Sequence, residues 1–197
     1  MLFEAYIHDL LQLLPSYQKK KEKAEMRALL EQKRRILSTE EVATCSQEVV
    51  DAIRQTAEYR QAKHILVYYP VKNEIDLREL FQDASADKHF YLPVTHRRGL
   101  ELREYIGEEN MKKGKFGIPE PQTPTYRGKI DLMLIPGVGF DHKLYRMGRG
   151  GGYYDRLLRL YRRSHKIGIG YKFQWVDTIP HTHHDKRMNQ IITAVTK

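Results

Sequence analysis

The sequence predicts a single α/β domain with three layers, α/β/α, around a largely parallel or mixed central sheet. Short, continuous apolar runs at 64–69 and 130–135 are typical of strands that are buried on both faces. Stretches with apolar residues at helical spacing lie between such runs, as in a sheet whose faces are covered by helices. The length of 197 residues is enough for one domain with its own core.

Charge and cysteine content exclude several classes of protein. The formal net charge of +9 fits either an anionic partner or a solvated basic surface. The single cysteine, Cys45, excludes an internal disulfide framework and a multi-cysteine metal site, and we expect a half-buried structural thiol. No apolar run approaches the roughly 20 residues of a membrane span, and residues 1–15 lack the basic start of a secretory leader. We therefore expect a cytoplasmic protein that does not bind membranes.

The first elements are predicted to be helices. Residues 1–18 form an N-terminal extension of unknown role, with a short helix that ends before Pro15. A helix is predicted over 19–37, where apolar residues recur on one face. Ser38 and Glu41 have the spacing of a capping box, which predicts that a second helix begins there.

The remaining elements alternate between strands and helices. Asp76 is the predicted N-cap of a helix that continues through Phe81, and another helix is predicted over 153–163. The proline-rich segment 112–127 is predicted to be irregular, and long irregular segments in compact domains often carry function. Strands are predicted at 64–69, 89–94, 100–106, 130–135, 166–171 and 190–195.

The densest group of candidate functional residues follows the strand at 130–135. Arg146, Gly148 and Arg149 precede three consecutive glycines, 150–152, and a predicted helix begins directly after them. Glycines let backbone N–H groups approach a ligand closely, and the arginine fork matches phosphate oxygens. Because ligands of parallel sheets bind beyond the carboxyl ends of the strands, the loop predicts a phosphate site there. It matches neither the P-loop nor the full dinucleotide fingerprint, and a flexible turn is the alternative use of its glycines.

Two aspartates and two tyrosines near this loop have more than one interpretation. Asp155 is either a helix cap or, together with Asp185, a ligand of Mg²⁺ beside a polyphosphate. The cluster of His181, His183, His184 and Asp185 resembles a transition-metal site, but its spacing gives weak support for zinc. Tyr153 and Tyr154 contact either substrate or pack in the core.

The segments PGVGFD (136–141) and RMGRGGGYYD (146–155) closely resemble the signature of the 5-formyltetrahydrofolate cyclo-ligase family. Four further segments match the family in order and spacing, so the resemblance covers most of the chain. They are Lys23 with Met26 and Arg27, the stretch 73–76, the stretch 116–121, and His184 with Asp185.

The resemblance implies a fold, a reaction and a set of site residues. The fold is a three-layer α/β/α domain over residues 19–197. The reaction converts 5-formyltetrahydrofolate and ATP to 5,10-methenyltetrahydrofolate, ADP and phosphate with Mg²⁺. Arg149 and Tyr153 are implied to be catalytic, Asp155 and Asp185 to hold Mg²⁺, and Glu74, Phe116 and Tyr154 to bind the folate. The implied nucleotide-binding residues are Lys23, Arg27, Arg146, Met147, Gly148, Arg149, Gly150, Gly151, Gly152, Tyr153 and Tyr154.

Two departures and two alternative functions accompany the resemblance. Residues 1–18 precede the usual start of the family's first helix, and Asn189 stands where an acidic residue is common. A nucleic-acid-binding module would suit the basic composition, but the charge is dispersed and no recognition motif accompanies it. A small-molecule kinase that uses the same loop is the other alternative. We expect a monomer, no nucleic-acid partner, and a folate substrate with or without a tail of several glutamates.

Overall fold

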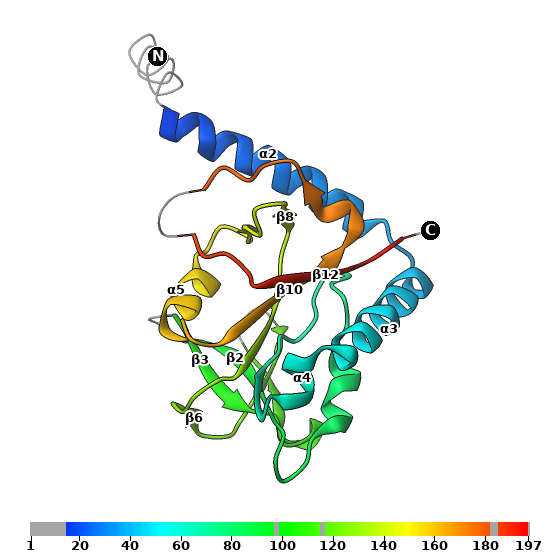
Figure 1. Ribbon diagram of the computed structural model, residues 1–197, viewed down its shortest axis with the longest axis vertical. Helices are drawn as coiled ribbons and strands as arrows, with labels where there is room; N and C mark the ends of the chain where they lie inside the picture. Colours follow the sequence, from blue (N-terminus) through cyan, green and yellow to red (C-terminus); the bar gives the residue numbers. More distant parts are fainter. Residues whose placement is uncertain (1–14, 97–98, 115–116, 182–184, 197) are drawn as a thin grey trace.

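The computed structural model describes residues 15–96, 99–114, 117–181 and 185–196, and Figure 1 shows their arrangement. Four α-helices and three short 3₁₀ helices occur in these ranges. Their bounds are α2 Pro15–Arg35, α3 Thr39–Gln55, α4 Ala57–Gln61, η1 Arg78–Asp83, η2 Glu108–Asn110, α5 Tyr153–Leu160 and η4 Lys172–Gln174. None of the helices in these ranges is long and apolar enough to cross a membrane.

A seven-stranded mixed sheet forms the middle layer, with the strand order β12-β10-β7-β1-β2-β3-β6. The five strands from β12 to β2 are parallel, whereas β3 and β6 are antiparallel to their neighbours. The bounds are β1 His64–Leu66, β2 His89–His96, β3 Gly99–Glu104, β6 Thr125–Tyr126, β7 Leu132–Pro136, β10 His165–Tyr171 and β12 Gln190–Ala194. The prediction of a single α/β sheet of parallel or mixed type is confirmed.

The central strands carry apolar side chains on both faces because successive side chains of a strand point to opposite sides. On β7, Leu132 and Leu134 join one hydrophobic cluster, whereas Met133 and Ile135 join another. The first cluster includes Val49 and other residues of α3, and the second includes residues of α5. In Figure 1, α3 and α4 accordingly lie on the opposite side of the sheet from α5, which gives the three layers.

The helix α2 lies across one end of the molecule, over a second, smaller sheet (Figure 1). That sheet has the order β11-β8-β9, and Leu30 of α2 packs with Val138 and Met147 beside it. A two-stranded sheet of β4 and β5 completes the described part. The bounds are β4 Met111–Lys113, β5 Pro119–Pro121, β8 Gly139–Asp141, β9 Arg146–Met147 and β11 Trp175–Val176.

Several local predictions differ from the structure. The helix α2 begins at Pro15 rather than Lys19, since proline is well suited to the first turn of a helix. The expected helix after Asp76 is the 3₁₀ helix η1, because the Asp76 carboxylate binds the Arg78 backbone and guanidinium instead of starting an α-helix. The segment 112–127 is not wholly irregular, since it contributes residues to β4, β5 and β6.

The predicted capping box and the predicted thiol can both be located in the structure. Ser38 Oγ accepts from Glu41 N, and the Glu41 carboxylate accepts from Ser38 N, as predicted. Cys45 is fully buried rather than half-buried, and its Sγ lies 3.6 Å from the Val195 carbonyl oxygen.

Candidate active site

The candidate site lies beyond the carboxyl ends of β7, β1 and β10, which are adjacent and parallel. The loop after β7 continues through β8 and β9 to the glycines, and the loop after β1 leads to Glu74. Because three strands end at one edge of the sheet, residues far apart in the sequence meet there.

The segment PGVGFD supports this loop rather than lining it. The Phe140 ring is fully buried against Gly168, where any Cβ would lie only 2.5 Å from the ring. The buried Asp141 carboxylate accepts hydrogen bonds from Lys143 N at 3.0 Å, Tyr145 N at 2.9 Å and Ile179 N at 3.0 Å. Asp141 therefore closes the turn between β8 and β9 and ties it to the segment before residue 181.

The glycine loop adopts backbone conformations that side chains disfavour. Gly150 has φ +97° and Gly152 has φ +64°, and Gly152 is the N-cap of α5 without a side-chain capping bond. The first N–H groups of α5 are therefore open to an anion, which the helix dipole also favours. These features fit the predicted phosphate site.

Two cations from α2 reach the same region. Arg27 Nε donates to the Gly148 carbonyl oxygen at 2.8 Å, and a Cβ at Gly150 would lie 3.7 Å from the Arg27 guanidinium carbon. Lys23, one turn earlier on α2, lies with its Nζ 3.6 Å from an Asp185 carboxylate oxygen. The structure thus brings the predicted Arg27 to the glycine loop and pairs the predicted Lys23 with the predicted Asp185.

The side chains of Arg146 and Met147 are buried. The Arg146 guanidinium donates to the Pro136 carbonyl oxygen at 3.2 Å and to Asp155 Oδ1 at 3.2 Å, and a Cβ at Gly148 would lie 2.8 Å from its Nη1. The Met147 side chain belongs to the core cluster beneath α2. The contact of both residues with the nucleotide stays a prediction.

Glu74 and Arg149 are paired across the site. Glu74 is only 9 % exposed, and Arg149 Nη2 donates to its Oε1 at 2.7 Å. Arg34 Nη1 lies 3.6 Å from the same oxygen, while Val71 N donates to Oε2 at 3.1 Å. The residue predicted to bind the folate and the arginine predicted to be catalytic therefore share one carboxylate oxygen.

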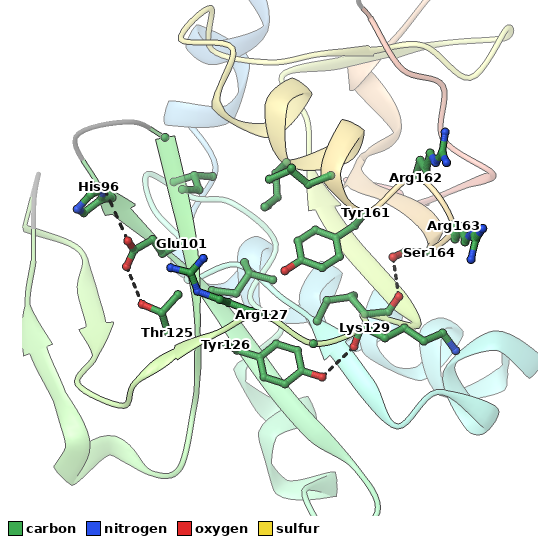
Figure 2. Close-up of a pocket in the computed structure, with 17 residues that line it drawn as sticks. His96, Glu101, Thr125, Tyr126, Arg127, Lys129, Tyr161, Arg162, Arg163 and Ser164 are labelled. Atoms are coloured by element: carbon green, nitrogen blue, oxygen red, sulfur yellow. Dashed lines mark hydrogen bonds and ion pairs between the residues drawn. The ribbon is translucent and has the colours of Figure 1, made fainter.

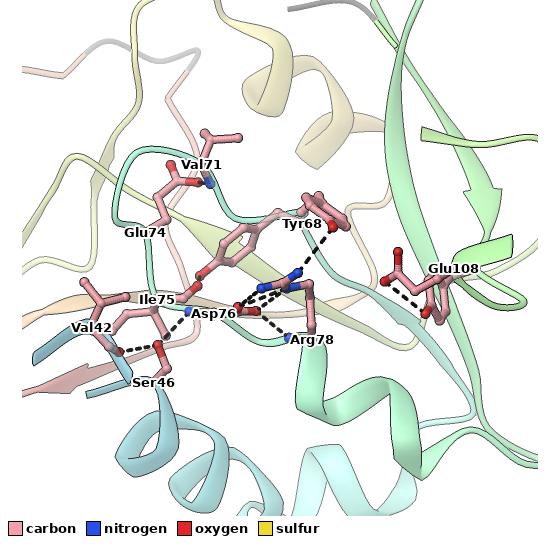
Figure 3. Close-up of polar contacts among 11 residues, drawn as sticks. Val42, Ser46, Tyr68, Val71, Glu74, Ile75, Asp76, Arg78 and Glu108 are labelled. Carbon is pink, nitrogen blue, oxygen red and sulfur yellow. Dashed lines mark hydrogen bonds and ion pairs between the residues drawn. The ribbon is translucent and has the colours of Figure 1, made fainter. Parts of the chain in front are cut away.

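The loop that carries Glu74 is fixed by polar contacts on both sides. Asn73 has φ +58°, and its Nδ2 donates to the Leu37 carbonyl oxygen at 3.0 Å, while the Tyr171 hydroxyl donates to its backbone oxygen at 2.9 Å. Figure 3 shows the following residues, where the Tyr68 hydroxyl donates to the Ile75 carbonyl oxygen and Ser46 Oγ accepts from Asp76 N. These contacts fix the direction of the Glu74 side chain.

The two tyrosines of the motif lie in different surroundings. Tyr154 is half-buried beside Glu74, and burial, with the Glu74 charge, raises the pKa of its hydroxyl well above the usual range. The Arg156 guanidinium lies over the Tyr153 ring, 4.9 Å from its centre. Tyr154 is thus close to the predicted folate side of the site, and Tyr153 is at the start of α5.

Some of the predicted metal-ligating residues lie within the described part of the structure, and others lie outside it. Among the described residues, Asp155 uses Oδ1 for Arg146 and Oδ2 has no hydrogen-bond partner, and the described residues hold no cluster of three or more metal-ligating side chains. Phe116, His183 and His184 lie outside the described residues, and the His181 ring stacks on Tyr145. Asn189 pairs with Lys166 at the amino end of β10, which is the edge of the sheet opposite the site.

A groove separate from the glycine loop lies along α5. It encloses about 860 Å³ between β3 and β6 on one side and the C-terminal half of α5 on the other. Figure 2 shows Arg127, Lys129, Arg162 and Arg163 along it, with Glu101 held by Thr125 and His96. At the Gly99 end, Arg156 reaches back to the Gly151 carbonyl oxygen at 3.4 Å, so the groove starts beside the glycine loop.

Comparison with known proteins identifies the family. The model of the 5-formyltetrahydrofolate cyclo-ligase family matches residues 19–194. The chain belongs to this family. A 5-formyltetrahydrofolate cyclo-ligase of Haemophilus influenzae is 33 % identical over 147 residues, which cover 70 % of this chain and 79 % of that protein.

Two solved structures of family members have the same fold. The 5,10-methenyltetrahydrofolate synthetase of Aquifex aeolicus has a TM-score of 0.78 and 32 % identity, covering 87 % of this chain and 89 % of its own. The synthetase of Mycoplasma pneumoniae has a TM-score of 0.67 and 29 % identity, covering 86 % and 97 %. The cyclo-ligase resemblance and the three-layer fold are therefore confirmed.

Sequence reasoning missed two buried charged residues of this cyclo-ligase site. Arg34 lies four residues after the buried Leu30 on the same face of α2, so its spacing carried a signal, but a charged residue among lysines and arginines is usually solvated. Asp141 lies inside the PGVGFD segment, so the motif contained a signal for it, although its role is to hold the backbone.

Proposed function

We propose that this protein uses ATP and Mg²⁺ to convert 5-formyltetrahydrofolate to 5,10-methenyltetrahydrofolate, with ADP and phosphate as the other products. The observation that carries the proposal is the meeting of the glycine loop, Arg27 and Arg149 with the buried Glu74 at one sheet edge in a cyclo-ligase family member. One side of this arrangement suits phosphates and the other suits the N–H groups of a pterin.

The chemistry requires activation of the formyl oxygen. An N-formyl group is an amide, so its carbon is a poor electrophile and its oxygen a poor leaving group. Transfer of the ATP γ-phosphoryl group to that oxygen releases ADP and makes the oxygen part of a phosphate. Attack by the neighbouring N10 closes the ring, N10 loses its proton, and phosphate departs. No nucleophile from the protein is needed, which agrees with the buried position of Cys45.

The protein would contribute positioning and positive charge, on which phosphoryl transfer mainly depends. In the proposal, Lys23, Arg27 and the loop amides bind the polyphosphate, and Arg149 stabilises charge on the transferred group. Tyr153 lies at the N-terminus of α5, where it can contact the same group, while Glu74 accepts from the pterin beside Tyr154. Phe116 is proposed to pack against the pterin.

The residues proposed for the metal fit Mg²⁺ chemically. Mg²⁺ binds through one or two carboxylates together with phosphate oxygens, and Asp155 Oδ2 has no partner among the described residues. Asp185 would be the second carboxylate, held near the loop by Lys23. When bound, Mg²⁺ would neutralise charge on the phosphates.

A folate with several glutamates is the substrate form that the charge distribution favours. The groove along α5 begins beside the glycine loop, and among the described residues Arg127, Arg162 and Arg163 have no partner for their guanidinium groups. Three unpaired cations in one groove would attract a chain of carboxylates.

One assay separates the proposed function from both alternatives. The purified protein is mixed with 5-formyltetrahydrofolate, ATP and Mg²⁺, and the methenyl product is followed by its near-ultraviolet absorbance while ADP is measured in parallel. We expect both signals in equal amounts and neither without ATP. ADP release with a non-folate acceptor would support the kinase, and salt-sensitive oligonucleotide binding without turnover would support the nucleic-acid module.

The monomeric state and the cytoplasmic location stay predictions. Light scattering of the purified protein measures its oligomeric state.

A further inference from the structure

Arg34 is a charged side chain in an unusual place. It lies near the C-terminal end of α2 with 3 % of its surface exposed, whereas its neighbours Lys33 and Arg35 are exposed. Burial lowers the pKa of its guanidinium, and the Glu74 carboxylate opposes that shift. A buried charge is costly unless it is paired, so a structural reason for Arg34 must lie in what it faces.

The Arg34 guanidinium is incompletely satisfied within the protein. Its Nη1 lies 3.6 Å from Glu74 Oε1, and its Nε is buried and has no hydrogen-bond partner among the described residues. By contrast, Arg149 is 39 % exposed and holds the same oxygen at 2.7 Å. The exposed cation therefore has the short contact with Glu74, and the buried cation has the long one.

The proposed function creates a conflict at this carboxylate. Turning the Arg149 guanidinium toward the transferred phosphoryl group would lengthen or break its Nη2 contact with Glu74. Once Arg149 leaves, Glu74 would be a buried carboxylate without its closest cation, and an unpaired buried charge is costly. A second, permanent cation at Glu74 removes this conflict.

We infer that Arg34 is the positioning residue that keeps Glu74 paired and oriented for the pterin, while Arg149 exchanges Glu74 for the nucleotide phosphates. The inference rests on the proposed function for the identity of the two ligands. The inference also predicts a coupling between the two ligands that the proposed function does not require, because nucleotide binding frees the Glu74 oxygen to which Arg149 donates. ATP binding should therefore strengthen folate binding.

The groups around Glu74 leave this role to Arg34. Tyr68, Tyr154 and Tyr171 also face it, but burial raises the pKa of each hydroxyl above its usual range, so each is neutral at physiological pH. Glu31 faces Arg34 and adds negative charge. Among the described residues, Arg34 and Arg149 are therefore the cations placed to balance Glu74.

The first test compares Arg34→Met, Arg34→Lys and the matched control Arg35→Met, which changes an exposed arginine at the next position. We expect Arg34→Met to raise KM for the folate about 10-fold or more while KM for ATP stays within about twofold, since Glu74 loses a charged partner that only the folate side of the site depends on. Arg34→Lys should recover part of the loss, and Arg35→Met should match the wild type. Thermal unfolding without ligands checks that each variant is folded.

Equal increases in both KM values, or a fall in kcat alone, would overturn the role of Arg34. If Arg34→Met does not fold, Arg34→Lys decides, because a lysine without the arginine fork should still give a selective rise in folate KM. In that case, a folded Arg34→Lys enzyme whose folate KM equals that of the wild type contradicts the inference.

The second test measures the coupling by titration calorimetry in the presence of Mg²⁺. We expect a non-hydrolysable ATP analogue to lower the folate Kd of the wild type several-fold, and to leave the folate Kd of Arg149→Met unchanged. An unchanged Kd in the wild type would overturn the exchange. A wild type that shows this coupling but forms no methenyl product would overturn the proposed reaction while supporting the exchange, so the two failures are distinguishable.

Discussion

At the scale of single residues, the site is built from buried charges whose partners come from distant elements. Glu74 follows β1, Arg34 ends α2, and Arg149 lies in the glycine loop, yet the three meet at one carboxylate oxygen. Such a cluster is costly to bury, so its members are expected to have specific and separable effects when they are replaced.

Replacing Arg149 by alanine should lower ATP-dependent turnover at least about 100-fold, because removal of one charge-stabilising group in a transition state commonly costs that much. The measurement is kcat for methenyl formation at saturating ATP and folate. Arg159→Ala is the control, since Arg159 is an exposed arginine of α5 and should leave kcat unchanged. Near-normal turnover by Arg149→Ala would remove it from the catalytic residues.

Replacing Glu74 by glutamine should weaken folate binding more than ATP binding. The glutamine keeps the shape of the side chain but loses the charge that accepts pterin N–H groups, and it turns one oxygen into a donor that faces Arg34 and Arg149. Separate titrations with each ligand give the two Kd values, and the exposed Glu48→Gln is the control. Equal losses for the two ligands would reject the folate role of Glu74.

At the scale of elements, the loop between β7 and α5 shows how a motif can combine support with function. Phe140 and Asp141 hold the backbone, and the glycines that follow present N–H groups.

We predict that Asp141→Ala lowers the free energy of unfolding by about 3 kcal/mol, because three backbone donors lose a charged acceptor in the interior. Urea unfolding measures it, with the exposed Lys143→Ala as the control expected within about 0.5 kcal/mol of the wild type. A change of similar size in both variants would contradict this structural role.

The same loop shows which elements a sequence can predict. Continuous apolar runs reveal β1, β7 and β10, and the polar spacing of Ser38 and Glu41 reveals the start of α3, because each pattern is local. Strands of two or three residues, such as β8, β9 and β11, are too short to have a period and exist because they pair with each other.

The candidate site likewise contains residues that the sequence predicts and features that only the folded structure shows. The glycines and nearby arginines are contiguous, and Lys23 and Arg27 are four residues apart on one helix, so all of them were predicted; the structure places Arg27 2.8 Å from the Gly148 carbonyl oxygen. The hydrogen bonds of the Arg146 side chain and the burial of a charge at Arg34 depend on packing between elements, which one sequence does not record. A charged residue in a basic helix is usually solvated, and only the fold distinguishes the exception.

At the scale of the whole molecule, part of the net charge of +9 lies in one groove of the described surface. The groove along α5 contains Arg127, Lys129, Arg162 and Arg163 but a single carboxylate, Glu101, which is held by Thr125 and lies near His96. Lys129 is paired with Asp131 at 2.8 Å, so the three arginines supply the unbalanced charge. A field of this kind acts over a Debye length of about 10 Å at 0.1 M salt and is screened beyond it.

Glutamate tails should therefore lower KM through these arginines. We predict that 5-formyltetrahydrofolate with three glutamates has a several-fold lower KM than the monoglutamate at low salt, and that the advantage shrinks as salt rises. Steady-state kinetics with both substrates at two salt concentrations measure it. The triple change of Arg127, Arg162 and Arg163 to glutamine should abolish the advantage while leaving kcat with the monoglutamate unchanged, whereas Arg159→Gln, which lies on α5 and does not line the groove, should preserve it. If the triple variant keeps the lower KM for the triglutamate, the tail binds elsewhere on the protein. If the wild-type KM does not change with added glutamates, the tail proposal is rejected, whereas the proposed reaction is tested separately by the absorbance assay.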